Sequence, residues 1–239
     1  MGLTDHGEKS SAEAHARRVR DMFAKISPRY DLLNHLLSGN IDKRWRRNVV
    51  EKLRPLLSTN AQVLDVACGT GDLSIALFEN IGVRVTGVDF CRPMLERAAR
   101  KEPRIAFVEG DALQLPFDDA VFDAVTIAFG LRNLSSVEQG LSELRRVLQP
   151  KGRAAILEFS KPVVPGFRSL GAVYCTRLLP RIGGIISGSR SAYEYLPDSV
   201  ARFPDQETLS AMMTAAGFAD VEFENLTGGI AALHTGRRA

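Results

Sequence analysis

Short apolar runs alternate with helical segments from residue 61 onward, and this alternation constrains the fold more than any other feature of the chain. The apolar runs cover residues 61–67, 83–89, 104–110, 122–129 and 153–159, and helical patterns over 73–79, 92–101 and 136–148 separate them. Such alternation predicts a parallel sheet with helices on both faces. A helix over 206–216 and two strands, 220–226 and 230–236, complete an expected seven-stranded, mostly parallel α/β sheet.

The segment that precedes this sheet has a helical pattern. Its apolar side chains recur at the spacing of an amphipathic helix. Ser27 is expected to cap a short helix, and Asp42 is expected to cap a longer one that ends near Pro55. We therefore expect an N-terminal helical cap over residues 1–57 and one large domain over residues 58–239.

A helical insertion over residues 161–203 follows the fifth strand. Glycines and prolines are interleaved there with apolar side chains. Because a long insertion after a strand is often functional, the segment is expected to be a substrate lid. The alternative is an apolar helix pair that packs on the body of the protein or on a second subunit, as in a homodimer.

Positive charges gather in two segments of the chain. The net charge is +3, but residues 1–54 hold 12 Lys and Arg against 7 Asp and Glu, and residues 161–193 hold five Lys and Arg and no acid. This asymmetry indicates an anionic partner, either a membrane surface or a nucleic acid, although a solvated helix face gives the same pattern.

Composition limits the setting in which the chain works. No apolar stretch is long enough to span a bilayer, and the first residues lack the apolar core of a secretory signal. The three cysteines form neither a paired framework nor a metal-binding motif, so no metal is expected. We expect a cytoplasmic protein that reaches the inner face of the cell membrane only as a peripheral protein.

A glycine-rich turn, DVACGTGD over residues 65–72, joins the first strand to the next helix. Glycines such as Gly69 and Gly71 let a ligand approach the backbone where a sheet ends. The turn lacks the third glycine of a dinucleotide fingerprint and the Gly-Lys-Ser/Thr of a phosphate-binding loop. Asp72 would repel a pyrophosphate but attract an ammonium group, which indicates S-adenosylmethionine rather than a nucleotide phosphate.

Carboxylates also lie at or near the ends of the neighbouring strands. Asp89 ends the second strand, 20 residues after Gly69, and is placed to accept ribose hydroxyls. Asp111 and Ala112 follow the third strand and can hold an adenine through a carboxylate and a backbone N–H. Asp65 is expected to hold the glycine-rich loop by accepting backbone N–H bonds.

The fourth strand argues against a nucleic-acid substrate. It runs into AFGLRN over residues 128–133, where an amino-group methylase of nucleic acids typically has Asn/Asp-Pro-Pro-aromatic. The chain also has no Pro-Cys dipeptide, which the RNA cytosine methylases use as a nucleophile. Nucleic acid is therefore not expected as a partner.

Longer motifs resemble one family, the bacterial ubiquinone/menaquinone biosynthesis C-methyltransferases. The resemblance covers nearly the whole chain from Val19, and its most specific motifs are AFGLRN (128–133), EFSKP (158–162) and NLTGGIAALHTG (225–236). It implies a class I Rossmann-like fold of the S-adenosylmethionine-dependent methyltransferases, with residues 58–239 as the methyltransferase domain. It also implies methyl transfer to a ring carbon of a polyprenylated quinol, either demethylmenaquinol or a benzoquinol.

The same resemblance assigns roles to single residues. It implies that four residues bind the methyl donor: Thr70, Asp89, Asp111 and Ala112. The chain departs from the family pattern at Leu33, at Ala128, where a serine is frequent, and at Lys151, where a glycine is usual. Asp42 stands where the family usually has a histidine, so that histidine is not available here as a base.

Carbon methylation requires an electron-rich ring, which a quinol supplies best as its phenolate. Arg132 is expected to stabilise this phenolate, and Asn133 is expected to orient the same oxygen. The alternative for Arg132 is a structural ion pair with a loop carboxylate. Four residues are candidate general acids or bases, and none is chosen among them: Tyr30, His35, Tyr193 and Tyr195.

The two basic segments, residues 1–54 and 161–193, are expected to help bind a polyprenylated substrate. They are expected to surround the polyprenyl tail while their Lys and Arg side chains rest on anionic lipid. Two other functions stay open: an O- or C-methyltransferase for another phenolic or isoprenoid acceptor, and a non-catalytic scaffold in quinone biosynthesis.

Overall fold

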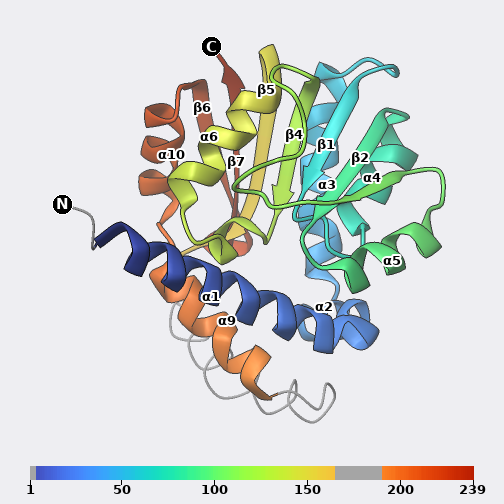
Figure 1. The fold of residues 1–239 in the computed structure, drawn as a ribbon. Helices are drawn as coiled ribbons and strands as arrows, with labels where there is room; N and C mark the ends of the chain where they lie inside the picture. Colours follow the sequence, from blue (N-terminus) through green and yellow to red (C-terminus); the bar gives the residue numbers. More distant parts are fainter. Residues whose placement is uncertain (1–3, 165–189) are drawn as a thin grey trace.

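A seven-stranded sheet forms the centre of the computed structural model, which describes residues 4–164 and 190–239 (Figure 1). The strands are β1 Gln62–Val66, β2 Arg84–Asp89, β3 Ala106–Glu109, β4 Phe122–Ala128, β5 Leu148–Phe159, β6 Phe218–Leu226 and β7 Ala231–Arg238. They lie in the order β3-β2-β1-β4-β5-β7-β6. The strands from β3 to β5 are parallel, and β7 is antiparallel to both of its neighbours, which confirms the expected mostly parallel sheet.

Helices cover both faces of this sheet. The described helices are α1 Thr4–Ile26, α2 Tyr30–Leu37, α3 Ile41–Leu53, α4 Asp72–Ile81, α5 Arg92–Lys101, α6 Val137–Val147, α9 Arg190–Arg202 and α10 Gln206–Ala215. Successive strand side chains point to opposite faces, so adjacent residues of β1 enter different cores. Leu64 packs in one core with residues of α6 and α10, and Val63 packs in the other with residues of α3 and α4.

Two predicted helix caps are wrong. Ser27 lies in a 3₁₀ turn, Ser27–Arg29, where its hydroxyl donates to the carbonyl of Ala24 and caps no helix. Asn40 precedes α3 with a φ of 63°, so Asp42 lies inside the first turn of that helix. The Asp42 carboxylate instead accepts hydrogen bonds from His35, Ser38 and Arg46, because the turn between α2 and α3 brings these side chains to it.

The strand β5 is longer than predicted. It begins at Leu148 rather than at residue 153, because Leu148 pairs with Phe122 before the register shifts. The intervening turn contains Lys151, which has a left-handed φ of 68°. The glycine that the family usually has there would adopt this conformation at lower cost.

The N-terminal helices lie at the end of the sheet where the parallel strands terminate (Figure 1). α1 runs beside α9 across this end, whereas α3 shares a core with α4 and the sheet. The prediction assigns α3 to the N-terminal cap, whereas α3 packs as part of the body. The domain boundary at residue 57 stays a prediction.

Most of the insertion predicted as a lid, residues 165–189, lies outside the described residues. In the part of the chain that the structure describes, we find no helix with the length and apolar character needed to cross a membrane.

Candidate active site

A cavity of about 470 Å³ opens where β1, β2, β3 and β4 end. Ligands of parallel α/β sheets bind at this edge, because the loops after the strands converge there. Phe23 of α1 and Tyr30 of α2 form part of the wall. Five of the ten predicted site residues line the cavity: Gly69, Asp89, Asp111, Ala112 and Asn133. The other five do not line it: Asp65, Thr70, Gly71, Asp72 and Arg132.

The glycine-rich turn between β1 and α4 depends on left-handed backbone. Gly69 has a φ of +56° and Gly71 a φ of +82°. A Cβ atom at Gly71 would lie 3.0 Å from the Cβ of Ala98 and 3.1 Å from the ring of Phe107. Gly71 therefore serves the turn and its packing on α5 and β3. Ala67, which does line the cavity, keeps a φ of 50° although it has a side chain, and such strain is concentrated at functional sites.

Asp89 presents a buried carboxylate to the cavity. Its Oδ2 accepts the backbone N–H of Gly69 at 2.9 Å, and its Oδ1 accepts the N–H of Cys91 at 2.8 Å. Burial raises the pKa of Asp89 to about 6, against the opposing effect of these N–H donors. Each carboxylate oxygen can accept a second hydrogen bond, so the pair of ribose hydroxyls predicted for Asp89 can still be bound.

Asp111 and Ala112 line the cavity in the turn after β3. The Oδ1 atom of Asp111 accepts the backbone N–H of Leu113 at 2.9 Å, which fixes the carboxylate. The other oxygen can accept a hydrogen bond from an exocyclic amine. The position therefore suits the adenine contact predicted for these two residues.

The charges of the wall test which ligand fits. Among the described residues that line the cavity, Asp89 and Asp111 are acidic and none is a lysine or arginine. The only charged side chains that a pyrophosphate would meet in this described lining are negative, whereas a sulfonium or ammonium group would be attracted to them. The volume also lies in the usual range of about 300–1,000 Å³ for small-molecule sites. S-adenosylmethionine, which has a sulfonium and no phosphate, fits this lining.

Asp65 lies behind the loop and supports it. Its oxygens accept hydrogen bonds from Ser74 Oγ at 2.6 Å and from Thr126 Oγ1 at 2.8 Å. Asp65 thus holds this region through two hydroxyls, one on α4 and one on β4, in addition to a backbone hydrogen bond from Ser74 of the predicted kind. Burial raises the pKa of Asp65 to about 6.

Arg132 lies behind the cavity wall and not in it. Its Nη1 lies 2.8 Å from Glu158 Oε1 and also donates to the carbonyl of Phe129. The ion pair weighed as the structural alternative is therefore present, with a carboxylate of β5 as the partner instead of a loop carboxylate. The charge of Arg132 nevertheless lowers the pKa of Tyr30 and of Tyr195, while burial raises both more strongly.

Asn133 lines the cavity with its amide held at both ends. Its Nδ2 donates to the carbonyl of Phe129 at 3.2 Å, and its Oδ1 accepts the hydroxyl of Tyr195 at 3.1 Å. The His15 Nε2 atom lies 3.3 Å from the backbone oxygen of Asn133. Through these contacts α1 and α9 both reach the AFGLRN turn. The side chain of Tyr193 lies outside the described residues.

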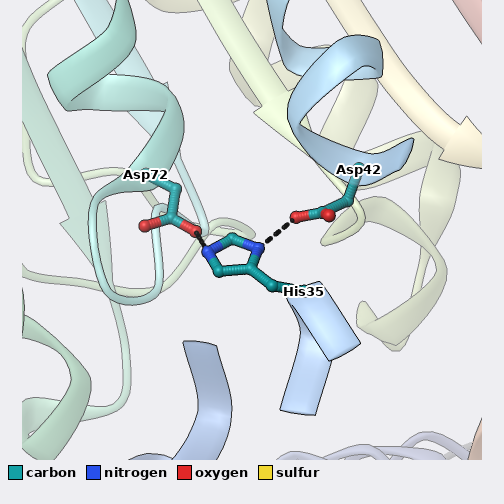
Figure 2. Close-up of side chains that lie close together, drawn as sticks. All are labelled: His35, Asp42 and Asp72. Atoms are coloured by element: carbon teal, nitrogen blue, oxygen red, sulfur yellow. Dashed lines mark hydrogen bonds and ion pairs between the residues drawn. The ribbon is translucent and has the colours of Figure 1, made fainter. Parts of the chain in front are cut away.

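Asp72 belongs to a charged cluster beside the cavity. Its carboxylate lies 2.8 Å from Lys101 Nζ, 3.8 Å from His35 Nε2 and 3.8 Å from Arg46 Nη2 (Figure 2 shows the histidine). Basic side chains of the protein thus pair with Asp72 where the donor's ammonium group was predicted to do so. His35, Asp42 and Asp72 could together offer three metal ligand atoms, but Arg46 and Lys101 already neutralise the two carboxylates.

Sequence reasoning missed several residues of this region. Thr70 is buried, and its hydroxyl donates to Asp31 of α2, which also lies 2.6 Å from Lys101 Nζ. No local signal links residues 31 and 101, because only the fold brings them together. The Arg46–Asp42 pair has i,i+4 spacing on a helix and could have been predicted.

Solved structures show the class to which this fold belongs. An S-adenosylmethionine-dependent methyltransferase of Thermotoga maritima superposes with a TM-score of 0.67, at 17% identity, over 92% of this chain and 99% of that chain. Phosphoethanolamine N-methyltransferase 2 of Haemonchus contortus, solved with S-adenosyl-L-methionine, has a TM-score of 0.58 at 16% identity over 80% and 51% of the two chains. The chain has the class I fold of S-adenosylmethionine-dependent methyltransferases, as predicted.

Sequence comparison narrows this class to a family. The ubiE/COQ5 methyltransferase family matches residues 11–238. The demethylmenaquinone methyltransferase of Thermus thermophilus is 52% identical over 222 residues, which cover 91% of this chain and all of that protein. The ubiquinone/menaquinone biosynthesis C-methyltransferase UbiE of Citrifermentans bemidjiense is 47% identical over 92% and 96% of the two chains. The chain belongs to the ubiE/COQ5 methyltransferase family.

Asp89→Asn should weaken donor binding at pH 7 and abolish its pH dependence below pH 7. A carboxylate with a pKa of about 6 loses its charge as the pH falls, so the wild-type affinity for S-adenosylmethionine should decrease about tenfold by pH 5. Isothermal titration calorimetry from pH 5 to pH 7 measures this step. Asp65 titrates in the same range, so a step that persists in the variant would contradict the assignment to Asp89.

Proposed function

We propose that this protein transfers a methyl group from S-adenosylmethionine to a ring carbon of a polyprenylated quinol. The observation that carries this proposal is the cavity at the strand ends, whose acidic lining suits a sulfonium donor and whose far wall is the AFGLRN turn. S-adenosylmethionine, when bound, supplies a methyl group activated by its positive sulfur. The carboxylates of Asp89 and Asp111 then hold its ribose and adenine.

The acceptor is proposed to be demethylmenaquinol. The support comes from the relative in Thermus thermophilus, which is named a demethylmenaquinone methyltransferase and matches over its full length. A benzoquinol is the second candidate, because the relative in Citrifermentans bemidjiense, at 47% identity, is named for both ubiquinone and menaquinone biosynthesis.

Arg132 contributes by stabilising negative charge on the acceptor oxygen. Burial raises the pKa of the two nearby phenols, Tyr30 and Tyr195, and the positive charge of Arg132 opposes this rise. A quinol hydroxyl at the cavity wall would experience the same positive charge, which acts in favour of its phenolate. Ionisation of that hydroxyl raises the electron density of the neighbouring ring carbon, which can then attack the methyl group.

Asn133 orients the acceptor. Its amide is fixed by Phe129 and Tyr195, which leaves one N–H of Nδ2 able to donate to the acceptor oxygen. A preorganised acceptor lowers the activation barrier of methyl transfer, because the reacting carbon and the methyl group are already close and aligned. Tyr195 therefore acts through Asn133, from the α9 side of the cavity.

Incubation of the protein with methyl-labelled S-adenosylmethionine and demethylmenaquinol tests the proposal. Mass spectrometry should find the label on a ring carbon of menaquinol. Label on oxygen would favour the alternative O-methyltransferase, and no transfer to demethylmenaquinol or the matching benzoquinol would favour the scaffold. Either outcome would contradict the proposed reaction.

Arg132→Met should lower kcat about 100-fold, the usual loss when a group that stabilises a developing oxyanion is removed. The single variant leaves Glu158 as a buried charge without its partner and can therefore fail to fold. The double variant Arg132→Met/Glu158→Gln keeps the charge balance and is the appropriate test. Steady-state kinetics together with thermal melting measure both effects, and a folded double variant with wild-type kcat would exclude this role for Arg132.

We also propose that the corner formed by α2 and α3 rests on anionic lipid, which gives the enzyme access to a membrane-dissolved tail. Leu32 and Leu36 are 61% and 55% exposed, and Ile41 is 39% exposed. Lys43 and Arg44 are exposed beside Ile41. Apolar side chains next to basic ones are the combination that binds anionic bilayer surfaces.

Leu32→Ser/Leu36→Ser should reduce binding to vesicles of phosphatidylglycerol and phosphatidylcholine by tenfold or more. Inserting two leucines contributes about 1.5–3 kcal/mol each when they are fully buried, and serine loses this. Vesicle sedimentation measures the change. Phe223→Ser is the matched control, because Phe223 is exposed on β6; equal binding by both variants would contradict the proposed surface.

A further inference from the structure

A chain of ion pairs joins α2 to the body of the protein, and the proposed reaction does not use it. The ammonium group of Lys101, at the end of α5, lies 2.6 Å from Asp31 Oδ2 on α2 and 2.8 Å from Asp72 Oδ1 on α4. One positive charge thus bridges two carboxylates from different elements. Without Lys101, these two negative charges would repel each other.

His35 makes a second bridge from the same helix. Its Nδ1 lies 2.8 Å from Asp42 Oδ2 at the start of α3, and its Nε2 lies 3.8 Å from Asp72 Oδ2 at the start of α4 (Figure 2). The imidazole therefore lies between the two carboxylates. Arg46 also contacts the carboxylates of both Asp42 and Asp72, so basic and acidic side chains alternate through the cluster.

These bridges end on the loop that forms the donor cavity. Asp31 accepts a hydrogen bond from the hydroxyl of Thr70, which stands between Gly69 and Gly71. Tyr30, the residue before Asp31, lines the cavity and lies 4.0 Å from the place where a Cβ of Gly69 would be. Any movement of α2 away from the loop would therefore remove the Tyr30 wall of the cavity.

The polar contacts of α2 are partly shielded from water, whereas two of its described apolar side chains, Leu32 and Leu36, are more than half exposed. The charged side chains are better shielded, since Lys101, Asp31 and Asp72 are 30%, 29% and 21% exposed. Ion pairs that are partly withdrawn from water are weakened less by salt than fully exposed pairs.

We propose that Asp31, His35, Asp42, Asp72 and Lys101 form a latch that holds α2 over the donor cavity, so that Lys101 and His35 are positioning residues for donor binding. The latch acts through Tyr30 and the glycine-rich loop, and none of the five latch residues lines the cavity. Opening of the latch lowers the fraction of molecules whose cavity is complete, which weakens donor affinity by that fraction. The inference rests on the proposed function only in taking S-adenosylmethionine as the ligand.

Three lysine variants test the latch. Lys101→Met removes the charge and keeps the length of the side chain, and Lys101→Arg restores a cation that can bridge both carboxylates. Lys52→Met is the matched control, because Lys52 forms an exposed pair with Glu222 on the outside of the sheet. His35→Leu tests the second bridge in the same assays.

The readouts separate positioning from general stability. Calorimetry measures the Kd for S-adenosylmethionine and S-adenosylhomocysteine, amide hydrogen exchange measures local opening of residues 30–37, and thermal melting measures the whole fold. Lys101→Met should raise both Kd values about tenfold, the factor expected when the closed state falls to a tenth of the population. Exchange in residues 30–37 should become faster, the kcat at saturating donor should stay within twofold, and Lys101→Arg should recover most of the affinity.

The opposite results would overturn the inference. The latch is excluded if Lys101→Met and His35→Leu bind the donor within twofold of wild type, or if their exchange in residues 30–37 equals that of Lys52→Met. Weaker binding accompanied by equal loss of stability across the whole chain would also exclude it, since that pattern marks a structural role. These assays need no quinol, so a latch can fail while the proposed reaction stands; a wild-type protein that binds no S-adenosylmethionine would overturn both.

Discussion

The buried carboxylate of Asp65 ties together the elements that shape the donor cavity. It joins β1 to α4 through Ser74 and to β4 through Thr126, directly below the turn that contains Ala67 and Gly69. Burial raises the pKa of this carboxyl, so its charged form depends on these two hydroxyls. In this turn, the N–H of Gly69 donates to the carboxylate of Asp89, which links the ends of β1 and β2.

Acidic and basic side chains lie on different sides of the cavity. The described lining of the donor side is acidic, whereas Arg132 lies behind the opposite turn and Lys101 and Arg46 lie outside the cavity. In the proposed reaction, a positive donor would face the acidic side, and an acceptor that becomes negative would lie toward Arg132 and its partner Glu158. Fixed charges of this kind lower a barrier without any movement during the reaction.

Prediction from the sequence succeeded where local pattern and topology coincide. The order of strands and helices follows from apolar periodicity, and residues such as Asp89 and Asp111 lie at strand ends that parallel topology brings to one edge. It was less successful where a side chain had a choice of partners. The sequence predicts Asp42 as a cap and Asp72 as a donor contact. Asp42 is instead paired with Arg46 of its own helix and with His35 of α2, and Asp72 is paired with Lys101 of α5.

The sequence by itself determined the doubly wound sheet, the acidic strand ends and the family, because these depend on periodicity and on motifs that are contiguous in the chain. Only the tertiary structure decided that Arg132 pairs with Glu158, that Asn133 is held by Tyr195, and that Lys101 links Asp31 to Asp72. The physical reason is distance along the chain. Ion pairs form between whichever charges the packed helices and strands bring within a few ångströms of each other. The spacing of residues along the chain does not show which charges these are.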